Sequence, residues 1–195
     1  LQAGSQTWVG VHRIHTLEHP GLSFLIVSDG SRRAQAAVDL GGQIARLAHA
    51  RVTLIGCGLE GEALHAHLQE ARKQLGSGLA ALDVQTSQNT PAQAVTLAVE
   101  QQPYDLVVLG FDPREDLSLA EQILQVGEHH LLLVTNLQPA PQRALICVTS
   151  GEPGKDDILF AGRLVRHLGA EATLLSVLPA ADQSADLIKR TENFL

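Results

Sequence analysis

The residues best placed to do chemistry are Asp29-Gly30-Ser31, which directly follow the apolar run Phe24–Val27. A short apolar run bounded by turn residues is typical of a strand buried on both faces of a parallel sheet. In open α/β sheets, ligands collect at the loop that leaves the carboxyl end of a central strand. The Asp29 carboxylate could therefore contact a ligand, or it could form an ordinary turn and helix cap together with Ser31. The local sequence leaves both interpretations open.

The histidines show no familiar catalytic or metal-binding spacing. His12, His15 and His19 lie in a polar segment, where imidazoles are usually solvated. His65 and His67 occupy different faces of a predicted helix, which indicates a solvated helix surface. We therefore predict no metal site.

The remaining nucleophiles and loops also suggest no enzyme. Cys57 and Cys147 both fall in predicted strands, so we expect two buried thiols in a reducing cytoplasm rather than a disulfide. The pair His129-His130 precedes a strand and is expected at its solvent-facing entry. The glycine-rich segment 150–156 lacks the spacing of a phosphate-binding loop and is interpreted as a turn and helix start.

The elements that must position these residues alternate between strand and helix. We expect strands at 24–28, 52–57, 79–86, 104–110 and 131–135, and helices at 32–48, 60–75, 91–101 and 117–126. This alternation with short loops predicts an α/β fold, an open parallel sheet with helices on both faces. The strands around Leu25–Ser28 and Leu106–Leu109 carry the strongest apolar runs and are expected to be adjacent at its centre. The Gly41-Gly42 pair suggests close packing of a helix on the sheet.

The first strand–helix–strand pattern occurs twice. Leu25–Gly58 aligns without a gap to Leu145–Leu178, at a constant offset of 120 positions. The repeat predicts a strand at 144–149, a helix at 154–168 and a strand at 172–177, with a last helix beginning near Gln183. We therefore expect a domain at 23–136, a truncated second unit at 143–195, and a linker or the tail of an upstream domain at 1–22.

Composition limits the class of partner. The chain is 45% hydrophobic and 18% charged, and its formal net charge is −7. Binding to nucleic-acid phosphates needs clustered Lys and Arg, so this charge argues against such a partner. No stretch approaches the length of a membrane-spanning apolar segment.

Several segments in order resemble the universal stress protein family. They are IVSDGS, VTLIGC, QNTPAQAV, YDLVVLG and LSLAEQILQVGEHHLLLV, all within residues 24–135, and residues 144–195 resemble a truncated second copy. The resemblance implies a five-stranded sheet of order 3-2-1-4-5 and frequent dimerisation through the last strand. It also implies ATP binding in many members, and pseudo-dimers in tandem members.

Only part of the family's nucleotide site has matching residues in this sequence. It implies that Asp29 contacts the nucleoside and that Val27 lies beside the base. ATP-binding members have a Gly-x2-Gly-x9-Gly-(Ser/Thr) motif after the fourth strand. Gly110 holds its first place and Ser118 its last, but Pro113 replaces the second glycine and the interval is too short. The phosphate half of the site is therefore expected to be broken.

Charge in this loop points the same way. Asp112, Glu115 and Asp116 would face a triphosphate with only Arg114 against them. In the second copy Thr149 stands at the position equivalent to Asp29, and no phosphate loop follows it. Adenosine and AMP are thus expected to bind at least as well as ATP.

The expected function is a non-enzymatic, cytoplasmic regulatory or stress-response module with weak or lost adenine-nucleotide binding. We expect it to associate with itself through residues 131–135, as a homodimer or pseudo-dimer. One alternative is the soluble cytoplasmic regulatory domain of a membrane transporter or channel. Another is an ATP-binding universal stress protein whose intact phosphate loop is not represented in this sequence. An ATP-hydrolysing enzyme would need a loop, a metal-binding carboxylate and a base that the sequence does not suggest.

Overall fold

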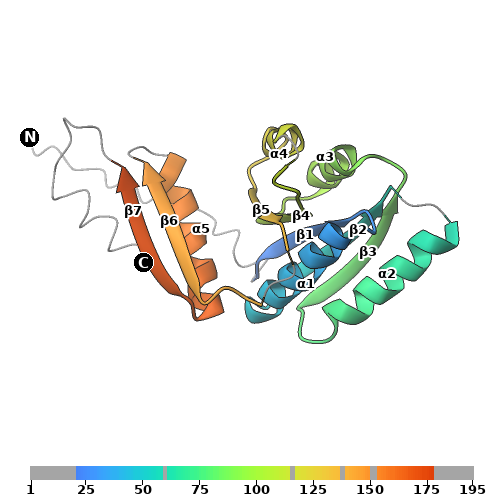
Figure 1. Cartoon of the computed structure of the whole chain (residues 1–195), viewed down its shortest axis with the longest axis horizontal. Helices are drawn as coiled ribbons and strands as arrows, with labels where there is room; N and C mark the ends of the chain where they lie inside the picture. Colours follow the sequence, from blue (N-terminus) through green and yellow to red (C-terminus); the bar gives the residue numbers. More distant parts are fainter. Residues whose placement is uncertain (1–20, 59–60, 115–116, 137–138, 150–152, 178–195) are drawn as a thin grey trace, which may run out of the picture.

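A five-stranded parallel sheet forms the main unit of the protein (Figure 1). The computed structural model describes residues 21–58, 61–114, 117–136, 139–149 and 153–177. The strands are β1 (Ser23–Ser28), β2 (Arg51–Cys57), β3 (Ala81–Ser87), β4 (Leu106–Gly110) and β5 (His130–Val134), in the order β3-β2-β1-β4-β5. This order confirms the predicted fold, with β1 and β4 adjacent at the centre and β3 at an edge.

Helices cover both faces of this sheet. They are α1 (Arg32–Leu47), α2 (Gly61–Leu75), α3 (Pro91–Gln101) and α4 (Ser118–Leu124). Successive side chains of a strand point to opposite faces, so β1 contributes to two cores. Phe24 and Ile26 pack with α1 and α2, whereas Leu25 and Val27 pack with α3 and α4. The central strand is therefore buried on both sides, as its continuous apolar run predicts.

Local sequence explains where two of these helices begin. The Ser31 hydroxyl accepts a hydrogen bond from the backbone N–H of Ala34 and caps α1. Thr90 and Gln93 form a capping box at the start of α3, where Pro91 is the first helical residue. These caps fix the ends of α1 and α3 beside the carboxyl edge of the sheet.

The Gly41-Gly42 pair lets α1 approach its neighbours closely, as expected. A Cβ atom on Gly41 would lie 3.0 Å from Ile26 Cδ1 and 3.2 Å from Val108 Cγ1. The equivalent atom on Gly42 would lie 2.7 Å from Leu75 Cδ2 of α2. Gly41 thus serves helix–sheet packing, and Gly42 serves packing between the two helices.

A smaller second unit follows the main sheet. It consists of β6 (Arg143–Thr149), α5 (Pro153–Leu168) and β7 (Glu171–Val177), and its two strands pair in parallel as a separate sheet. In Figure 1 this unit is the orange and red lobe beside the main sheet. Helix α5 also contacts the main unit, because Phe160, Leu164 and Leu168 pack against its α1-side core. The Phe160 ring stacks on His130 of β5, with ring centroids 3.8 Å apart.

Two sequence-based expectations about burial are wrong. Cys147 is exposed, because the face of β6 opposite α5 carries no cover among the described residues. His129 is buried, with 8% of its surface exposed, so it does not mark a solvent-facing entry to β5. Burial lowers the pKa of the His129 imidazole below its ordinary value. The segments 1–22 and 183–195, where a linker and a last helix were predicted, lie almost wholly outside the described residues.

Candidate functional site

A small cavity lies where the carboxyl ends of the central strands β1 and β4 meet. Its volume is about 70 Å³, and it is lined by Val27, Asp29, Arg33, Ala34, Pro91, Leu109, Gly110 and Leu119. Three of the four residues proposed for a nucleotide site are brought together here, namely Val27, Asp29 and Gly110. Ser118 is the first residue of α4 and is not part of this lining.

Asp29 forms the local turn that leads into α1. Its Oδ1 atom accepts a hydrogen bond from the backbone N–H of Ser31 at 2.9 Å, and Gly30 adopts a φ of +77° between them. The turn role considered for Asp29 is therefore real. A carboxylate offers about four lone-pair positions, so this single bond leaves acceptor capacity for a ligand.

Gly110 is required by packing at the end of β4. A Cβ atom at this position would lie 2.4 Å from the carbonyl carbon of Arg33 and 2.6 Å from the backbone nitrogen of Ala34. Both are backbone atoms of α1 and cannot rotate away. The glycine therefore lets the start of α1 press against β4, whatever role it has toward a ligand.

The loop after β4 is organised by an ion pair. Arg114 donates to Asp112 through Nε at 3.0 Å and through Nη2 at 2.7 Å, and its backbone N–H donates to Oδ1 at 3.0 Å. These bonds to Arg114 hold the pKa of the Asp112 carboxyl far below its usual range. Pro113, between them, has no N–H to offer a phosphate. The other two acids of the predicted loop, Glu115 and Asp116, lie outside the described residues.

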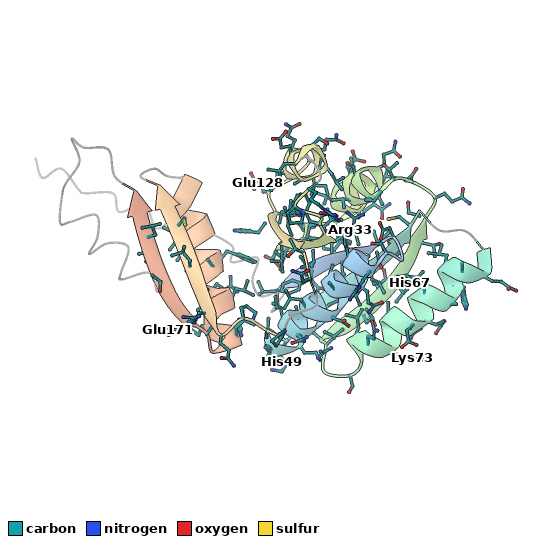
Figure 2. All side chains as sticks on the ribbon, viewed as in Figure 1. Arg33, His49, His67, Lys73, Glu128 and Glu171 are labelled. Carbon is teal, nitrogen blue, oxygen red and sulfur yellow. The ribbon has the colours of Figure 1, made fainter. Side chains whose placement is uncertain are left out.

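A second, larger cavity opens beside the first turn of α1. Its volume is about 590 Å³, and it is lined by Arg32, Arg33, Ala36, Phe111, Asp112, Pro113, Arg114, Thr135 and Asn136. This cavity was not predicted from the sequence, although the two consecutive arginines at the start of a helix were a usable signal. Arg33 lines both cavities and is labelled in Figure 2.

The helix pattern predicted a solvated surface for His67, but its side chain is half-buried and contacts the sheet. Its Nε2 atom lies 2.6 Å from Oγ of Ser28, the fully buried last residue of β1. His67 is labelled on α2 in Figure 2. The Ser28 hydroxyl is inaccessible to a substrate, so this pair links α2 to the sheet rather than forming a reactive dyad. Nearby Cys57 is also inert, because burial and the Asp29 charge raise the pKa of its thiol to about 11.

Metal sites and membrane-spanning helices were sought in the described part of the chain. There, no group of three His, Cys, Asp or Glu side chains could hold a metal ion. His12, His15 and His19 fall outside that part. None of the described helices is both long and apolar enough to cross a membrane.

Comparison with known proteins rests on structure. No protein-family model matches the sequence, and no curated protein matches it. A functionally unknown protein from Pseudomonas aeruginosa is 15% identical with a TM-score of 0.64, over 92% of this chain and 69% of that one. A universal stress protein from Archaeoglobus fulgidus is 14% identical with a TM-score of 0.60, over 88% of this chain and 73% of that one.

A third solved structure, described as a universal stress protein in complex with cAMP, is matched over nearly its whole length. It is 20% identical with a TM-score of 0.52, and the match covers 60% of this chain and 98% of that one. Identities this low establish architecture and not activity. The chain therefore has the fold of the universal stress proteins.

Proposed function

We propose that this protein is a non-enzymatic regulatory module that binds an adenine nucleoside weakly at the carboxyl ends of β1 and β4. The observation that carries the proposal is the convergence of Val27, Asp29 and Gly110 around one cavity at the switch point of the sheet. An apolar wall beside a carboxylate suits a flat base with a hydroxyl-bearing sugar. One structural neighbour is described as a cAMP complex, and a purine ligand for this chain is in keeping with that.

The dimensions of the cavity argue for weak binding. Ligand sites usually enclose about 300–1,000 Å³, and this cavity is much smaller, at about 70 Å³. Side chains such as Arg33 and Leu119 must shift before a nucleoside can enter, and that movement lowers affinity. Pro113 removes a backbone donor from the loop where ATP-binding relatives hold phosphates. Nucleoside contacts should therefore outweigh phosphate contacts at this site.

The residues that line the cavity support the proposal of a role without catalysis. Among the described lining residues, Asp29 is the only carboxylate, and none is a histidine, cysteine or lysine. General acid–base or nucleophilic catalysis needs such groups within hydrogen-bonding reach of the substrate. We accordingly propose a binding role in regulation or stress response, in the cytoplasm, with the second unit packed on the β5 region as the partner in a pseudo-dimer.

Titration calorimetry with adenosine, AMP and ATP tests the nucleoside site. Adenosine should bind weakly and at least as well as ATP, and Asp29→Ala should weaken adenosine binding about tenfold, as expected for one hydrogen bond to a charged group. Asp39→Ala is the matched control, since Asp39 lies on α1 and lines neither cavity. Circular dichroism confirms folding, because Asp29→Ala also removes a turn bond. Tight magnesium-dependent ATP binding would refute the proposal.

A further inference from the structure

His129 is a buried imidazole at the place where α3, α4 and β5 meet. Only 8% of its surface is exposed, and neither Nδ1 nor Nε2 has a hydrogen-bond partner among the described residues. A Cβ atom on Gly127 would lie 3.1 Å from Nδ1 of His129 and 2.6 Å from Cγ1 of Val99, so the ring packs against the loop before β5, close to α3. A polar ring without a partner destabilises this junction, and a charged ring would destabilise it much more.

Among the described residues, no negative charge lies beside His129 to compensate for a proton on its ring. The ionisable side chains on the surrounding elements are those of Glu100, Tyr104, Asp105, Glu121, Glu128 and His130. The three glutamates are exposed, and the Asp105 carboxylate accepts a hydrogen bond from the backbone N–H of Ser23. Of these groups only His130 acts on the pKa of His129, and its positive charge lowers that pKa further.

Burial decides which form of the ring the folded protein holds. The backbone carbonyl of Ile123, in the last turn of α4, favours the protonated ring. Burial outweighs this effect, so the pKa of His129 lies below its ordinary value of about 6.5. Because the fold accepts the neutral ring, stability at this junction is fully present above about pH 6.5 and is lost as the pH falls toward the folded-state pKa. Mild acid should therefore loosen the packing around His129.

Helix α4 connects His129 to the small cavity at which we propose nucleoside binding. Leu119 and Ile123 are one helical turn apart on α4, so they lie on the same face. Ile123 is buried in the core that contains Val27 and Leu109, and Leu119 packs against this core and lines the cavity. With only seven residues, α4 is too short to be stable alone and depends on this packing. Release of α4 would move Leu119 away from the cavity.

We propose that His129 is an acid sensor, and that a proton on its ring releases α4 from the sheet and opens the small cavity. The release of α4 stands by itself, whereas its effect on a ligand rests on the proposed function. At neutral pH the cavity holds about 70 Å³, which is too small for a nucleoside. A ligand that binds only the open form gains apparent affinity as that form becomes more populated. The site would therefore respond to acidification.

Hydrogen exchange of the full chain tests the release of α4. The amide of Glu121 donates to the Leu117 carbonyl, so its protection, corrected for the chemical effect of pH on exchange, reports how often α4 opens. From about pH 7.5 to about pH 5.5 this protection should fall several-fold, and at most about tenfold, because one pH unit below the ordinary histidine pKa favours the protonated open form tenfold. Helix α1 packs on the opposite face of the sheet, and its protection should change less than about twofold.

Substitutions decide whether His129 is the sensor. His129→Leu keeps a side chain of similar size that cannot be protonated, so the loss of α4 protection in acid should disappear. His129→Gln also stays neutral and should give the same result, should the leucine variant fold poorly. His65→Leu is the matched control, because His65 is exposed on α2, and it should keep the response of the unchanged protein. A response that persists in both His129 variants would overturn the proposal.

Calorimetry with adenosine at the same two pH values separates the sensor from the nucleoside site. Adenosine stays uncharged over this range, and it should bind the unchanged protein several-fold more tightly in acid but bind His129→Leu equally at both pH values. Equal or weaker binding to the unchanged protein in acid would overturn the opening of the cavity. If adenosine binds at neither pH while α4 is still released in acid, the nucleoside proposal alone is wrong. If α4 protection does not depend on pH, the acid sensor is wrong whatever adenosine does.

Discussion

At the scale of single residues, the contact least visible in the sequence is the hydrogen bond between Ser28 and His67. The two residues are 39 positions apart and their side-chain atoms are 2.6 Å apart. Helical periodicity correctly places His67 on α2, but it cannot show which buried polar group of the sheet forms a hydrogen bond with it. A fully buried hydroxyl requires a partner, and the sequence gives no local sign of which residue supplies it.

Removing the His67 imidazole should therefore destabilise the fold. His67→Ala leaves the buried Ser28 hydroxyl without its partner, and we expect the free energy of unfolding to fall by about 1–2 kcal/mol. The control is His65→Ala, on the same helix, where His65 is exposed and a change below about 0.5 kcal/mol is expected. Urea unfolding followed by circular dichroism measures both. Equal effects of the two substitutions would show that the bond contributes nothing.

Single residues of the candidate site could be predicted only where their neighbours in the sequence determine their position. Asp29 follows a buried strand and precedes a helix, so its place at the sheet edge could be deduced from order alone. The larger cavity beside the first turn of α1 could not be predicted in this way, because it combines the start of α1 with the loops after β4 and β5. Only the order of the strands shows that these three segments lie next to one another.

At the scale of elements, the sequence predicts nearly every strand and helix within two residues of its observed ends. Strong periodicity and clear caps explain this, as in α1, where Ser31 marks the start. What periodicity does not reveal is which helix covers which strand. Helix α5 illustrates this, since one of its faces packs on the β6–β7 sheet through Ile158 and Val165. Another reaches β5 of the main unit through Phe160.

The Phe160 contact should hold the second unit in place. Phe160→Ala removes the stacking on His130 and part of the packing of α5 on the main core, so residues 139–177 should become more sensitive to protease. Limited proteolysis with fragment masses should show cleavage in this region several times faster than in the unchanged protein.

Leu159→Ala is the control for that experiment. Leu159 neighbours Phe160 on α5 but is 37% exposed, so its loss should alter cleavage little. If both variants are cleaved as slowly as the unchanged protein, the contact between α5 and β5 does not anchor the second unit.

At the scale of the whole molecule, the repeated segments fold alike but are covered differently. Leu25 and Ile55 of the main sheet are 0% and 3% exposed, beneath α3 and α4. Their equivalents at the constant offset, Leu145 and Leu175, are 62% and 47% exposed. The repeat predicts the strand–helix–strand unit correctly. Burial depends on what packs above each strand, so the repeat alone could not predict it.

We expect the main unit to need α5 as a cover for β5 in order to stay monomeric. Strand β5 ends the order of the sheet, and on one of its faces Leu132 packs in the same core as Phe160, Leu164 and Leu168. A fragment of residues 21–136 keeps all five strands but loses α5. An uncovered apolar edge strand tends to pair with another copy, so we expect this fragment to dimerise.

Sedimentation velocity over a concentration series up to about 100 µM should detect that association, which follows mass action. Within the fragment, Leu132→Lys places a charge on the newly exposed face of β5 and should restore the monomer, because charged side chains protect edge strands from pairing. Leu97→Lys makes the same change on α3, where Leu97 is already 46% exposed, and should leave the dimer intact. A fragment that stays monomeric throughout would mean that β5 needs no cover. Dimers that survive Leu132→Lys would place the contact elsewhere on the sheet.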